Sequence, residues 1–148
     1  MMKLAAIIMA LLFVGVVVPV NAKVTDQDMA WVKAMSPGMK LVIDDAKVLA
    51  AVAATDNASM IQIACNTTKE DIISAETVNQ AMPVSKDVQP LKDDYTLLIS
   101  SMWTGVNDVG EGYATGNQTK VNLGGREIIA SSVYATKMNR DIDIAKAA

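Results

Sequence analysis

The chain has 148 residues, of which 51% are hydrophobic, 20% charged and only 4% aromatic. It contains no histidine and one cysteine, which excludes histidine-ligated metal or haem sites, a Ser-His-Asp triad and an internal disulfide. The formal net charge of -3 provides no basic field to attract nucleic acid. This length and composition predict one domain that uses no cofactor and no metal and does not bind nucleic acid.

The chain begins with the pattern of a secretory signal peptide, which we expect to span residues 1–22. Lys3 supplies a positive charge, residues 4–20 form an apolar run, and Ala22 is the small residue expected before a cleavage site. Cleavage would leave a single helical domain, residues 23–148, secreted or at the cell surface. The alternative is an uncleaved N-terminal anchor, because a run of about 17 apolar residues is at the lower limit for crossing a bilayer.

A short N-terminal helix is predicted over residues 25–35, because Thr25 suits its N-cap and two aspartates follow in the first turn. The sequence Ser36-Pro37-Gly38 predicts a break after it. Serine is a good N-cap and proline is tolerated at the first helical position, so a second helix is expected from there to about Ala54.

A third helix is predicted over residues 58–82, between the polar break at residues 55–57 and Pro83. Its apolar residues recur at helical spacing, but its middle, residues 66–71, is polar. Thr68 followed by Asp71 there resembles a capping box, so a kink in this helix is an alternative.

The clearest helical pattern follows Pro83. Ser85 is the expected N-cap, and Pro90 suits the first turn. Apolar residues then recur at spacings of three and four, which predicts one buried face of an amphipathic helix. These residues are Val88, Leu91, Tyr95, Leu98, Met102, Val106, Val109 and Tyr113.

Glycines dominate the next stretch and predict a loop over residues 110–117. The last helix is expected from Gln118 or Thr119 to about Ile144, with a start after Gly125 as the alternative. The pair Gly124-Gly125 is interpreted as a flexible helix entry or a close helix crossing rather than an anion site, because no phosphate-binding motif accompanies it.

These elements predict an all-α fold. No segment alternates cleanly between apolar and polar residues with the period of a strand. Long helices with short connections favour antiparallel neighbours. We therefore expect an up-down four-helix bundle preceded by the short extra N-terminal helix.

Three residues are the candidates for contact with a partner or ligand: Trp103, Tyr95 and Met102. Aromatic and methionine side chains are adaptable contact residues, although methionine more often fills a core. Trp103 lies beside the apolar face of its helix rather than on it, which predicts partial exposure and makes it the best single candidate.

Three sequons are candidate glycosylation sites, at Asn57, Asn66 and Asn117. Asn57 and Asn117 fall in predicted connections between helices, where asparagine also serves as a helix cap. Asn66 falls inside a predicted helix unless that helix is kinked.

Other residues that could carry chemistry are expected to be structural. The acidic pairs Asp44-Asp45 and Asp93-Asp94 suit a solvated face better than a cation site, because adjacent helical residues point about 100° apart. Cys65 is interpreted as a buried small hydrophobe, with an intermolecular link as the alternative. No serine has an identifiable base, so no enzyme is predicted.

Three functions remain, and each predicts a different structure. A non-catalytic secreted or cell-surface module that binds a protein partner predicts a filled core and an exposed apolar patch. A carrier or sensor of a small apolar molecule predicts a methionine- and aromatic-lined cavity of about 300 Å³ or more between helices. An enzyme with carboxylate chemistry predicts two facing acids with raised pKa values. The oligomeric state is left open.

Overall fold

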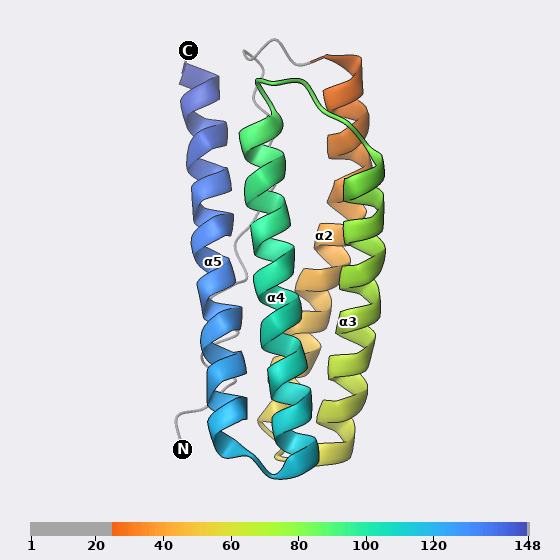
Figure 1. The fold of residues 1–148 in the computed structure, drawn as a ribbon, viewed down its shortest axis with the longest axis vertical. Coiled ribbons are helices and arrows are strands. Elements are labelled where there is room, and N and C mark those ends of the chain that lie inside the picture. Colours follow the sequence, from red (N-terminus) through yellow and green to blue (C-terminus); the bar gives the residue numbers. More distant parts are fainter. Residues whose placement is uncertain (1–24, 148) are drawn as a thin grey trace.

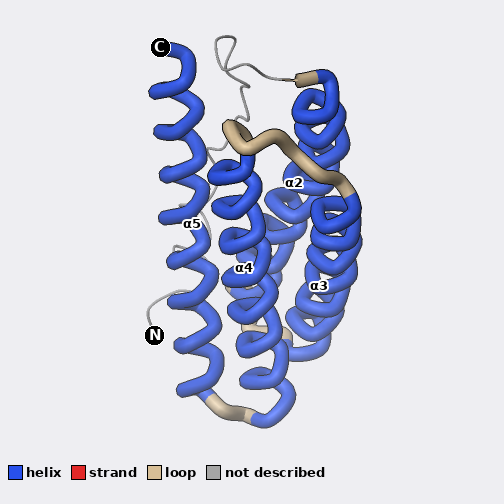
Figure 2. Tube along the Cα trace, turned by 45° about the horizontal axis from the view of Figure 1, so that its top comes forward, coloured by secondary structure: helices blue, strands red, loops and turns tan. Residues whose placement is uncertain are grey.

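The computed structural model describes residues 25–147, except the side chains of residue 136 and of residues 138–147. This part of the chain is all α-helical, as predicted, and it contains no strand (Figures 1 and 2). The expected signal peptide, residues 1–22, lies outside the described residues. The described helices are α2 (Asp26–Ala53), α3 (Ala58–Ala81), α4 (Gln89–Thr115) and α5 (Gln118–Ala147).

Helices that follow one another in the chain lie side by side and are joined at alternate ends (Figure 1). Helix α4 lies between α5 and the pair formed by α2 and α3. The connection between α3 and α4 crosses the end at which α2 begins and α5 ends (Figure 2). The core contains the predicted apolar face of α4: Tyr95, Leu98, Met102, Val106 and Val109 are all buried.

The predicted short N-terminal helix and the break after it were wrong. A single helix, α2, runs from Asp26 to Ala53 with Pro37 inside it. Pro37 lies on the exposed side, and the hydroxyl of Ser36 donates to the Val32 carbonyl oxygen at 2.8 Å instead of capping a new helix. The stripe of core residues continues on either side of the proline, which indicates that burial outweighs the roughly 3 kcal/mol cost of proline inside a helix.

The start of α2 follows the prediction, because Thr25 and Asp28 form a capping box. The Thr25 amide donates to Asp28 Oδ2 at 2.9 Å, and the Asp28 amide donates to Thr25 Oγ1 at 3.2 Å. The same carboxylate, through Oδ1, accepts the backbone N–H of Ser85 at 2.7 Å. Burial acts to raise the pKa of Asp28, but the hydrogen bonds from Ser85 and Thr25 outweigh it and lower that pKa. The start of α2 is therefore attached to the connection between α3 and α4.

The third predicted helix was correct, since α3 runs continuously from Ala58 to Ala81. The suggested kink is absent, and the Thr68 hydroxyl donates within the helix to the Ala64 carbonyl oxygen at 2.9 Å. Ser85 does not cap α4. The N-cap is Val88, and the amides of Val88 and Gln89 both donate to the Ser85 carbonyl oxygen.

The predicted loop over residues 110–117 was also wrong for most of its length. Helix α4 continues to Thr115 and ends at Gly116, whose positive φ of 66° is the left-handed conformation that glycine adopts without strain. Helix α5 then begins at Gln118, as expected.

Glycines allow α4 and α5 to approach closely, which confirms the interpretation of Gly124 as part of a helix crossing. A Cβ atom added to Gly105 would lie 2.6 Å from Ile128 Cγ1, and one added to Gly124 would lie 2.4 Å from the Gly105 carbonyl oxygen. A Cβ at Gly112 would lie 2.6 Å from Val121 Cγ2. These glycines are therefore required by packing.

Gly105→Ala tests this packing. Alanine favours a helix by about 1 kcal/mol over glycine, but the added methyl group overlaps the backbone of α5. We expect a net loss of about 2 kcal/mol in the free energy of unfolding, measured by urea denaturation, in the range found for overpacked cores. Gly110→Ala is the matched control. Its added Cβ would meet a side chain, Cys65 Cβ at 3.3 Å, whereas the Cβ at Gly105 would meet backbone atoms at 2.7 and 2.8 Å. Equal effects of the two substitutions would contradict the account.

Candidate functional site

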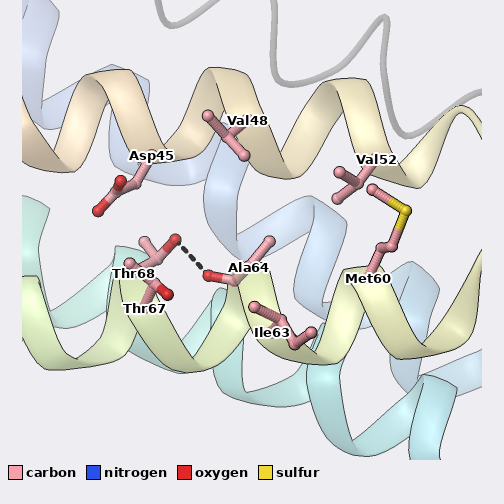
Figure 3. Close-up of a pocket in the computed structure, with 8 residues that line it drawn as sticks. All are labelled: Asp45, Val48, Val52, Met60, Ile63, Ala64, Thr67 and Thr68. Carbon is pink, nitrogen blue, oxygen red and sulfur yellow. Dashed lines mark hydrogen bonds between the residues drawn. The ribbon is translucent and has the colours of Figure 1, made fainter.

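The candidate site is a hollow between the second half of α2 and the first half of α3, with a volume of about 220 Å³ (Figure 3). It is open to solvent, because three of its apolar side chains are largely exposed: Val48 by 53%, Met60 by 47% and Ile63 by 64%. We call it the α2–α3 groove. Its lining residues are Asp45, Val48, Val52, Met60, Ile63, Ala64, Thr67 and Thr68.

Helical spacing places these side chains together. On α2, residues 45, 48 and 52 are three and four positions apart and share one face. On α3, residues 60, 63, 64 and 67 also share one face of the helix. Val52 and Met60 lie together near one end of the groove, whereas Asp45 lies at the other end, beside the two threonines (Figure 3).

Asp45 faces a second carboxylate across the helix pair, that of Asp71 on α3. Burial, the hydrogen bond with Asp71 that forms on protonation, and the negative charges of Asp71 and Asp44 raise the pKa of Asp45 to about 6. Its Oδ2 atom is buried and accepts no hydrogen bond. Asp45 therefore takes up a proton more readily than an ordinary aspartate, and its negative charge is repelled by that of Asp71 when it is ionised.

The neighbouring residue Asp44 has the opposite environment. Lys40 and Lys47 both donate to its carboxylate, the latter at 2.9 Å, and they lower its pKa to about 2. These lysines are therefore engaged on the exposed side of α2. Among the described residues, no lysine or arginine forms an ion pair with Asp45 or Asp71.

Asp45→Asn tests the repulsion between the carboxylates. A folded-state pKa of about 6, above the ordinary 3.8, means that Asp45 binds a proton more tightly in the folded protein than in the unfolded chain. The contribution of Asp45 to the free energy of unfolding should therefore fall as pH rises from about 4 to 6 and stay constant above that. We expect Asp45→Asn to be more stable than the wild type at pH 7.5, with the advantage disappearing by pH 4, in urea denaturation at each pH.

Asp93→Asn is the matched control, because Asp93 is exposed on α4 and its substitution makes the same change in charge. The same dependence of stability on pH in both variants would refute a specific interaction at Asp45.

The three contact residues predicted from sequence do not form a site together. Tyr95 and Met102 are only 1% and 4% exposed and belong to the core. Trp103 is 40% exposed, as predicted, but it lies on α4 and does not line the groove. Burial and the nearby charge of Glu76 raise the pKa of Tyr95, whose hydroxyl makes no hydrogen bond.

The sequon asparagines are all on the surface. Asn57 and Asn117 lie between helices, as predicted; the side chain of Asn57 accepts the Met60 amide, and that of Asn117 accepts the Lys120 amide, both at 3.1 Å. Asn66 lies within α3, and Thr68, the third residue of its sequon, is fully buried. A folded chain therefore exposes the complete sequon better at Asn57 and Asn117 than at Asn66.

Two other predictions concerned single polar groups. Asp94 does not belong to a solvated face, because it is buried and both of its oxygens accept hydrogen bonds from Lys137 of α5 at 2.6 Å. Cys65 is buried, as predicted. Its desolvation raises the pKa of the thiol to about 11, which keeps it in the less reactive protonated form.

Within residues 25–147, no helix is both long enough and apolar enough to cross a membrane. Among the side chains that the structure describes, no group of three or more acidic or cysteine residues is placed to hold a metal ion. In comparisons with known proteins, no family model, no curated protein and no solved structure matches this chain.

Proposed function

We propose that this protein is a non-catalytic module, built as an up-down four-helix bundle, that binds a protein partner through the α2–α3 groove. The observation that carries the proposal is the exposure of Val48, Met60 and Ile63 around a hollow in the surface. Neighbouring exposed apolar side chains are typical of sites that another protein covers. A partner that covers them would remove apolar surface from water, which favours association.

A carrier of small apolar molecules is the alternative, and the size and lining of the groove favour a protein partner over it. Pockets for such ligands typically have volumes of about 300–1,000 Å³ and aromatic walls. The α2–α3 groove has about 220 Å³, one methionine and no aromatic residue. The aromatic rings of Trp31 and Tyr95 pack against each other in the core, with their centroids 6.0 Å apart.

Asp45 has one property that an acid–base enzyme would need, which is a pKa raised to about 6. Catalysis also requires polar groups that orient a substrate beside the acid. The rest of the groove is mainly aliphatic, and the Thr68 hydroxyl is used within α3. These surroundings suit binding of an apolar surface better than a reaction.

The proposal places the protein outside the cytoplasm, on the evidence of the N-terminal sequence pattern. We expect the mature protein from its own source to have a mass that begins at Lys23, measured by intact-protein mass spectrometry. A mass that includes Met1 would instead favour the anchored alternative and contradict secretion.

The binding surface can be tested by selecting peptides from a random helical display library on the wild-type protein. We expect the selected peptides to lose at least tenfold in affinity on Ile63→Ser. Val133→Ser is the matched control, because Val133 on α5 is also a β-branched side chain that is 64% exposed. Binding that is equally sensitive to both substitutions, or to neither, would contradict the proposal.

A further inference from the structure

We propose that the α2–α3 groove binds a lysine side chain of the partner protein, with its ammonium group at Asp45, which lines the groove beside Asp71, and its methylene stem along the aliphatic wall. This inference rests on the proposed function and adds the chemistry of the group that is recognised. It depends on the size of the groove, on its unbalanced charge and on the order in which its residues lie.

The size of the groove suits one long side chain. About 220 Å³ is less than the typical volume of a pocket for a small organic ligand. The exposed Val48, Met60 and Ile63 surround the opening, so the backbone that carries the inserted side chain would rest on apolar surface. Partner helices commonly dock in this way, with one or a few side chains inserted into a groove.

The charge of the groove calls for a cation. Asp45 and Asp71 lie together, and no described lysine or arginine forms an ion pair with either. The lysines nearest to Asp45 in sequence, Lys40 and Lys47, form ion pairs with Asp44 instead, and Lys69, two positions before Asp71, forms no ion pair with it. The Asp45 side chain lines the groove, so an ammonium group bound there would pair with its carboxylate and offset the repulsion from Asp71.

The order of groups along the groove matches a lysine side chain. The acidic end holds Asp45, the centre holds Val48, and the far end holds Val52 and Met60 (Figure 3). A lysine side chain also has a polar end and an apolar part, because its four methylene groups pack on apolar surface while the ammonium group takes a polar partner. A neutral aliphatic side chain would leave the carboxylates unpaired, and an acidic one would be repelled.

The test uses n-hexylammonium as the probe and 1-hexanol as its neutral counterpart, with binding followed through the NMR methyl signals of Val48 and Ile63. We expect saturable shifts and a Kd for hexylammonium at least fivefold lower than for hexanol at low ionic strength, where screening is weak. The double variant Asp45→Asn/Asp71→Asn should abolish this preference and keep the hexanol affinity. Asp93→Asn should retain the preference.

Equal affinities for the two probes, or no saturable shift, would overturn the inference. Groove signals that shift on dilution without a probe would identify a second copy of this chain as the occupant and would also overturn it. Peptides that depend on Ile63 but bind without any basic residue would refute the lysine while leaving the proposed function intact. A failure to select any Ile63-dependent peptide would refute the proposed function itself.

Discussion

The antiparallel register of α2 and α3 is the constraint on which the groove depends. A buried hydrogen bond from Trp31 Nε1 to Asn79 Oδ1, 2.9 Å long, fixes this register near the start of α2. Two turns further along α2, the helices are in close contact, because a Cβ atom on Gly38 would lie 3.3 Å from that of Ala75. The same register brings Asp45 opposite Asp71. The acid pair therefore belongs to the same register as the Trp31–Asn79 hydrogen bond near the start of α2.

Elements with strong periodicity could be predicted from the sequence, whereas the continuation of α2 through Pro37 and of α4 through Gly110 could not. The apolar face of α4 and the extent of α3 both follow from spacings of three and four residues. Pro37 and Gly110 were interpreted as breaks, which is their usual local meaning. Tertiary packing overrides that meaning here, because each lies in a helix whose apolar stripe continues on both sides.

The groove could be predicted less well, because it depends on pairs of residues that are distant in sequence. Asp45 was recognised as a member of an acidic pair, but its partner across the helices is Asp71, and only the register reveals this. Tyr95 and Met102 were candidate partner or ligand contacts because of their chemistry, although their place on the apolar stripe already indicated the core. Periodicity predicts burial better than side-chain type predicts contact.

The glycine contact between α4 and α5 has a consequence for how this protein tolerates change over evolution. At Gly105 and Gly124 even a methyl group meets backbone atoms of the facing helix, so every other residue carries a cost to the fold. The rim of the groove has the opposite property, because Val48 and Ile63 point largely into solvent. Selection can therefore alter what the groove recognises while the scaffold beneath it stays unchanged.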